Sequence, residues 1–90
     1  MTKNIRNTYK NSTVRLDDNE FVECTFDHCR LIYSGTTPVS LVGCHLINVG
    51  WEFDGPANNT IQFLRGVYHG MGEGGRELVE RTFDDIRKPR

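Results

Sequence analysis

The side chains best suited to chemistry in this sequence are its three cysteines, Cys24, Cys29 and Cys44. A zinc site would need a CxxC pair or histidines at ligand spacing, and the intervals of five and fifteen residues supply neither. Their number is odd, and the polar residues 1–13 hold no apolar leader, so we expect free thiols in a reducing cytoplasm. We predict no metal and no cofactor.

The glycine-rich stretch 70–75 is a second candidate, because Gly70, Gly72 and Gly75 satisfy the pattern GxGxxG. Such a loop cradles a phosphate when it follows a strand inside a βαβ unit. Here it follows a segment with helical spacing, so we favour a plain linker turn. The alternative is a small-molecule site for a nucleotide or another phosphate ligand. The residues predicted to line that site are Tyr33, Trp51, Phe53, Arg65, His69 and Arg76.

Apolar residues in the first half of the chain recur at a period of five, which fits neither a helix nor a plain strand. Seven of the eight residues in this series are Leu, Phe or Trp. The series is Leu16, Phe21, Phe26, Leu31, Thr36, Leu41, Leu46 and Trp51. The residues two places earlier are small or medium-sized, namely Val14, Asn19, Cys24, Cys29, Ser34, Val39, Cys44 and Val49. This alternation indicates a repeated unit of five residues.

In this alternation the chain resembles the pentapeptide-repeat family over residues 14–53. The resemblance implies a right-handed β-helix with four faces, in which both repeated positions point inward. Four faces of five residues make one coil, so residues twenty apart stack at about the strand spacing of 4.8 Å. Two coils follow, with Phe21 under Leu41, for example, and Leu16 under Thr36. The family favours Asp or Asn just before the large residue, which this chain lacks, and residues 34–38 are expected to leave the register.

The same phase assigns roles to the other polar candidates. The three cysteines take the small inward position, where a thiol behaves as a compact apolar group. His28 and His45 fall on outward positions, so no Cys-His or Ser-His-Asp arrangement is supported and we predict no enzyme. The acidic residues Asp17, Asp18, Glu20 and Glu23 are interpreted as a solvated rim.

Trp51 and Phe53 form the densest aromatic cluster, at the exit of the second predicted coil. One interpretation is an apolar plug that seals the end of the core. The other is a pocket wall shared with Tyr33, which lies twenty residues before Phe53 and would stack on it. An exposed aromatic pair could hold a base or a ring.

Helical spacing replaces the five-residue period after Pro56. Ile61, Leu64 and Val67 lie on one stripe of a predicted helix over 57–69, and Leu78 and Ile86 belong to a second over 76–87. The predicted fold is therefore mainly β with C-terminal α: a short pentapeptide-like β-helix of about two coils followed by two amphipathic helices. We expect one domain over 1–90, with 1–13 a polar N-terminal segment.

Composition limits the function classes. The chain has 90 residues and a net charge of −1, and no apolar run is long enough to span a bilayer, which argues against a membrane protein and a nucleic-acid binder. A two-coil β-helix exposes unpaired backbone groups at both ends, and another element or a partner must cover them. We therefore predict a non-enzymatic interaction module, a homodimer that presents its β-helix surface to a protein partner. The predicted interface is an outward apolar strip of Val22, Ile32, Val42 and Ile47.

Overall fold

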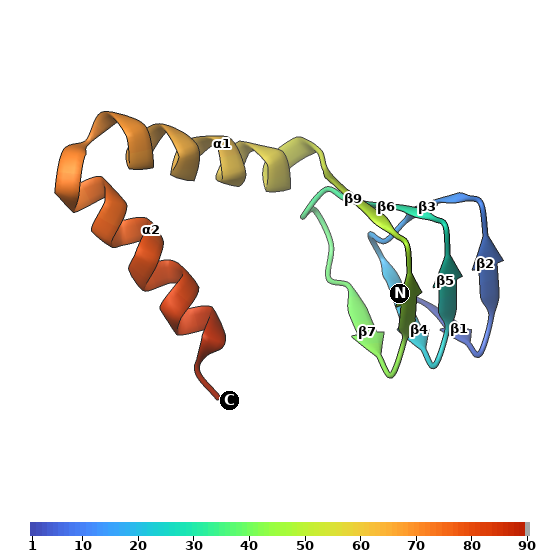
Figure 1. Cartoon of the computed structure of the whole chain (residues 1–90). Coiled ribbons are helices and arrows are strands. Elements are labelled where there is room, and N and C mark those ends of the chain that lie inside the picture. The colour runs from blue at the N-terminus through green and yellow to red at the C-terminus, as the bar shows by residue number, and fades with distance from the viewer. Residues whose placement is uncertain (90) are drawn as a thin grey trace. The chain divides into compact units, whose positions relative to one another are not determined.

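The structure, a computed structural model, describes residues 1–89. Within them nine short strands precede two helices (Figure 1). The strands are β1 (Thr2–Ile5), β2 (Thr8–Lys10), β3 (Thr13–Arg15), β4 (Asn19–Val22), β5 (Thr25–Asp27), β6 (Arg30–Tyr33), β7 (Ser40–Val42), β8 (His45–Ile47) and β9 (Gly50–Phe53). The helices are α1 (Gly55–Gly70) and α2 (Gly72–Arg87). This arrangement confirms the predicted order of a β-helix followed by two helices.

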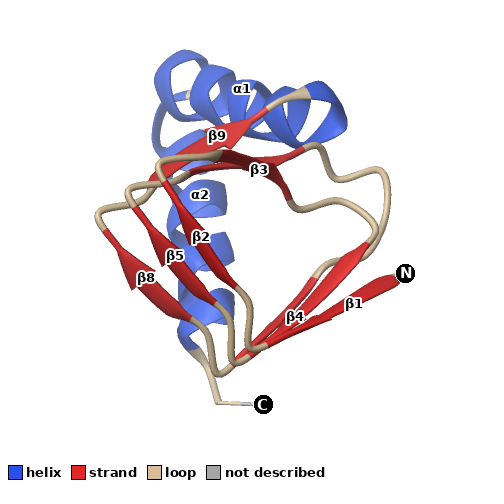
Figure 2. Ribbon diagram, turned by 90° about the vertical axis from the view of Figure 1, so that its right-hand side faces the viewer, coloured by secondary structure: helices blue, strands red, loops and turns tan. Residues whose placement is uncertain are grey.

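The strands form three parallel sheets with the orders β1-β4-β7, β2-β5-β8 and β3-β6-β9. Each coil contributes one strand to each sheet, as the parallel rows in Figure 2 show. The fourth side of the coil has no strand and consists of the connections 16–18 and 34–39. The described residues thus make three coils where the sequence predicted about two, because the segment 1–13 forms β1, β2 and the start of β3.

The first coil was missed because its phase differs from that of the others. Thr2 pairs with Asn19, an offset of 17 residues, whereas Glu20 pairs with Ser40, an offset of 20. The difference arises on the fourth side, where residues 16–18 make a shorter connection than residues 34–39. Asn4, Tyr9 and Val14 keep the five-residue spacing but stand outside the series that starts at Leu16.

Three columns of inward side chains build the core. They are Asn4–Phe21–Leu41, Tyr9–Phe26–Leu46 and Val14–Leu31–Trp51, and each follows the strand register. The middle member of each column is buried, together with Leu16, Cys24 and Cys29. Tyr9 stacks on Phe26 with ring centroids 5.2 Å apart. The predicted stacking at twenty residues is confirmed for the second and third coils, while Thr36 lies in the connection that leaves the register.

The chain separates into two compact units, Met1–Asn58 and a second that begins at Asn59. The expectation of one domain over 1–90 stays a prediction. The second unit holds most of α1 and all of α2, which meet at residues 70–72. The predicted turn over 70–75 is therefore wrong for most of its length, because α2 begins at Gly72 and includes Gly74 and Gly75.

Gly75 explains why a helix tolerates these glycines. A Cβ atom built on Gly75 would lie 2.0 Å from the Val67 carbonyl oxygen of α1. Two helices can approach this closely only where no side chain intervenes. Gly75 and Val67 are both buried where the two helices meet near their connection.

Candidate functional site

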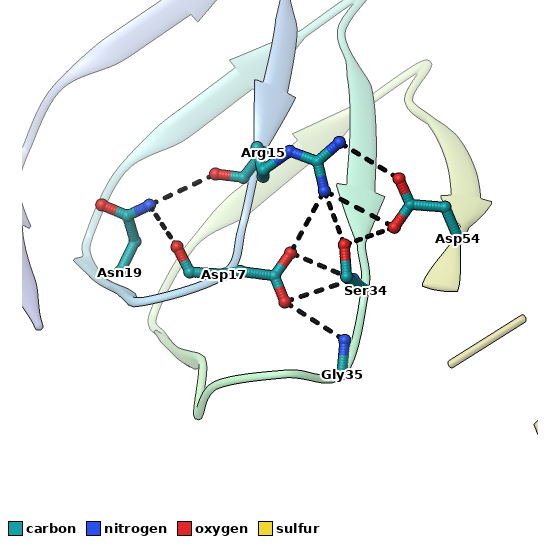
Figure 3. Close-up of polar contacts among 6 residues, drawn as sticks. All are labelled: Arg15, Asp17, Asn19, Ser34, Gly35 and Asp54. Carbon is teal, nitrogen blue, oxygen red and sulfur yellow. Dashed lines mark hydrogen bonds and ion pairs between the residues drawn. The ribbon is translucent and has the colours of Figure 1, made fainter. Parts of the chain in front are cut away.

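A polar cluster on the fourth side of the β-helix joins three distant parts of the chain (Figure 3). We call Arg15, Asp17, Ser34 and Asp54 the Arg15 cluster. The Arg15 guanidinium, at the end of β3, donates to the Ser34 hydroxyl at 2.6 Å and to the Asp54 carboxylate at 3.1 Å. The Ser34 hydroxyl in turn donates to Asp54. The side chains are thus paired with one another.

Asp17 anchors the long connection that leaves the register. Its carboxylate accepts hydrogen bonds from the backbone N–H groups of Ser34 at 3.0 Å and Gly35 at 3.1 Å. Its side chain is 9% exposed, which corrects the prediction of a solvated acidic rim at this position. Burial acts to raise the pKa of Asp17, but the hydrogen bonds from Ser34 and Gly35 outweigh it and hold that pKa below its usual value.

The pKa shifts within the Arg15 cluster are those of a structural ion-pair network. The hydrogen bond from Arg15, and then that from Ser34, lower the pKa of Asp54, and the same contact with Asp54 raises the pKa of Arg15. A general acid or base works best with a pKa near neutrality, and these shifts move both groups away from it. Sequence reasoning missed the cluster because Arg15 and Asp54 are 39 residues apart.

The first coil closes its end of the β-helix with polar groups. Asn4 occupies an inward position and donates to the Glu20 carbonyl oxygen at 3.2 Å. The Tyr9 hydroxyl donates to the Asn4 side-chain oxygen at 3.5 Å, and the Asn7 amide donates to that hydroxyl at 3.3 Å. These groups satisfy one another, and two of the three core columns end here in hydrogen-bonding atoms, while the third ends in Val14.

The last coil leaves the opposite end apolar. Leu41, Leu46 and Trp51 continue the three core columns, yet they are 39%, 45% and 50% exposed. Phe53 is also exposed and packs edge-on against Tyr33, with ring centroids 6.5 Å apart. We call Leu41, Leu46, Trp51 and Phe53 the open-end patch. The strands that carry the patch are the outer strands of their sheets, so hydrophobic side chains and strand edges coincide there.

The predicted outward strip is divided among the sheets. Val22 and Val42 pair in neighbouring strands β4 and β7, as predicted, and Ile5 extends that row into β1. Ile47 lies in the sheet β2-β5-β8 and Ile32 in the sheet β3-β6-β9. The four residues therefore do not form one continuous face.

The residues of the predicted anionic-ligand site lie in different units. Tyr33, Trp51 and Phe53 belong to the first unit, where Tyr33 and Phe53 form the expected aromatic pair. Arg65, His69 and Arg76 belong to the helices of the second, where their residues are exposed. The ligand site stays a prediction.

The cysteines occupy the inward positions that the five-residue phase assigned to them. Cys24 and Cys29 are buried and Cys44 is half-buried, and all three are free thiols. Their sulfur atoms lie 3.2–3.4 Å from backbone carbonyl oxygens of the preceding coil, those of Asn4, Tyr9 and Phe21. His28 and His45 are exposed, as predicted. Among residues 1–89 no group of three or more His, Cys, Asp or Glu side chains is placed to hold a metal ion.

Comparison with protein-family models, curated proteins and solved structures found no match to this chain. The pentapeptide-repeat resemblance therefore rests on the repeated residues alone. In the part of the chain that the structure describes, no helix has the length and apolar character needed to span a bilayer.

Proposed function

We propose that this protein is a non-enzymatic association module that forms a homodimer by docking the open end of one β-helix against that of a second copy. The observation that carries the proposal is Trp51, a half-exposed aromatic residue at a position that is fully buried one coil earlier, in Leu31. A core column that ends in solvent gains most from being covered by another apolar surface.

A second copy suits the patch because the two ends of the β-helix differ. At the first-coil end two of the three columns finish in the polar residues Asn4 and Tyr9, and Val14 alone finishes its column in carbon, which disfavours a head-to-tail contact. Two open ends that meet across a two-fold axis bury both patches in one contact and leave no further end to extend. Three free thiols also suit a protein kept in the reducing cytoplasm.

The area available supports a dimer of moderate affinity. The patch exposes roughly 400 Å² of apolar surface, so two copies would bury about 800 Å² from these side chains alone. Neighbouring side chains and strand edges would bring the contact toward the lower end of stable protein interfaces, at about 1,200 Å². Micromolar dissociation is the expected range.

The test is light scattering of Trp51→Lys at micromolar concentration, with Ile47→Lys as the matched control. Ile47 lies on the same last coil and is 45% exposed, but it alternates with Leu46 and so points outward. We expect the Trp51 variant to weaken association at least tenfold and the Ile47 variant to leave it unchanged. The opposite pattern would assign the interface to the outward face and overturn the proposal.

A further inference from the structure

The helical hairpin of the second unit has little core of its own. Val67 is its buried apolar side chain among the residues described, and Leu64, Val79 and Thr82 are half-buried. Both helices have 16 residues, a length at which an isolated helix is marginal in water. Helices of this length are normally held by packing, so this hairpin needs a surface to cover it.

Figure 1 shows why packing within the hairpin is incomplete. α1 and α2 cross closely at Val67 and Gly75 and then diverge from their connection. Ile86 continues the face of α2 that carries Gly75, Val79 and Thr82, yet it is 70% exposed. We call the exposed large apolar residues of this unit the hairpin apolar set. They are Ile61, Phe63, Tyr68, Leu78, Phe83 and Ile86.

We propose that the hairpins of two copies pack against each other as a four-helix bundle, with α1 of one copy against α2 of the other. Charge favours this pairing. α1 carries Arg65 and no acidic residue, whereas α2 carries five acidic and three basic residues. A two-fold axis makes both unlike-charged contacts at once, while pairing α2 with α2 would bring like net charges together.

The area of the hairpin apolar set fixes the upper limit of this contact. Six side chains that are roughly half exposed offer about 500 Å², so two hairpins would bury at most about 1,000 Å² from these side chains, and less where Ile61 and Phe63 lie on different flanks of α1. The polar face of α2 is already occupied by ion pairs within the helix, including Arg81 with Glu77 at 2.7 Å. The apolar side is thus the surface left for association.

This inference adds a second contact between copies to the open-end contact of the proposed function, and variants separate the two. Ile86→Glu places a charge in the proposed bundle. Because Ile86 is 70% exposed, this variant should still fold as an isolated chain. Gln62→Glu is the control, because the helical repeat puts it on the face of α1 opposite Leu64 and Val67. Ile86→Leu should retain association.

Light scattering at micromolar concentration is the measurement. We expect Trp51→Lys to associate more weakly than the wild type but to retain a dimer held by the hairpins, Ile86→Glu to retain a dimer held by the open ends, and the double variant to be a monomer. A monomeric Trp51→Lys beside a dimeric Ile86→Glu would overturn the hairpin contact and keep the proposed function. A monomeric Ile86→Glu beside a dimeric Trp51→Lys would overturn the open-end contact of the proposed function and keep the hairpin contact. An associated double variant would overturn both.

A second readout concerns the helices themselves. In the Trp51→Lys background, the protein is diluted to concentrations below the dissociation constant of the dimer. This dilution should remove roughly half of the helical ellipticity at 222 nm, because the hairpin loses its partner. Ellipticity that stays constant while the dimer dissociates would contradict the proposal.

Discussion

At the scale of single residues, position in the coil decides what a side chain does more than its chemical type. Asp17 is one of four nearby acidic residues, yet its side chain is only 9% exposed and accepts from two backbone N–H groups, while the side chain of its neighbour Asp18 is 65% exposed. The Arg15 cluster brings together residues that lie far apart in the sequence. Periodicity cannot reveal such a contact, because Asp17 and Ser34 lie outside the strands.

Replacing Asp17 by Asn should lower the free energy of unfolding by about 2 kcal/mol at pH 7, since hydrogen bonds to a charged acceptor are stronger than those to an amide. The folded-state pKa of Asp17 is lowered from 3.8, so its contribution is present above about pH 4 and is lost as pH falls through the lower folded-state value. Thermal melts from pH 7 to pH 2 measure this. The acid-induced loss should shrink in Asp17→Asn and persist in the control Asp18→Asn.

At the scale of elements, the strands and helices of this chain are stable for different reasons. Each strand of the middle coil is paired on both sides, and its inward residue is covered above and below. The helices have one tight crossing and otherwise expose their apolar residues. The crossing depends on a glycine that lies in a helix, where glycine normally costs about 1 kcal/mol relative to alanine.

Two neighbouring glycines test that explanation. Gly75→Ala should reduce the helical signal and its thermal midpoint, because the new methyl group would overlap the Val67 carbonyl oxygen at 2.0 Å. Gly74→Ala, which meets nothing within 4 Å, should raise helix stability by up to about 1 kcal/mol. Circular dichroism melts of the two variants compare them directly. Equal gains in both variants would rule out a close crossing.

At the scale of the whole molecule, the two ends of the β-helix have opposite chemistry. Tyr9 and Asn4 end their columns in hydrogen-bonding atoms, whereas Leu46 and Leu41 end the same columns in carbon. A β-helix that was apolar at both ends could add copies without limit, as open-ended stacking does. Under the proposed function, the polar first coil therefore limits contacts between β-helix ends to the last coil.

Making the first-coil end apolar should remove that limit. In Asn4→Leu, the inward amide that donates to the Glu20 carbonyl oxygen is replaced by carbon. We expect assemblies larger than the wild-type oligomer that grow with concentration, measured by light scattering or sedimentation. Lys3→Leu is the control, because Lys3 alternates with Asn4 and points outward. A mass equal to that of the wild type at every concentration would contradict the capping role.

The amino-acid sequence alone determined the five-residue period, the inward place of the cysteines and the change to helices near Pro56. These features are local or strictly repeated, so side-chain type and spacing reveal them. Only the tertiary structure decided the number of coils, the Arg15 cluster and the close crossing at Gly75. Each depends on residues brought together across a connection of irregular length, and a connection three residues shorter was enough to hide the first coil. Exposure at the open end was decided the same way, because Leu31 and Trp51 share one phase and differ only in whether another coil covers them.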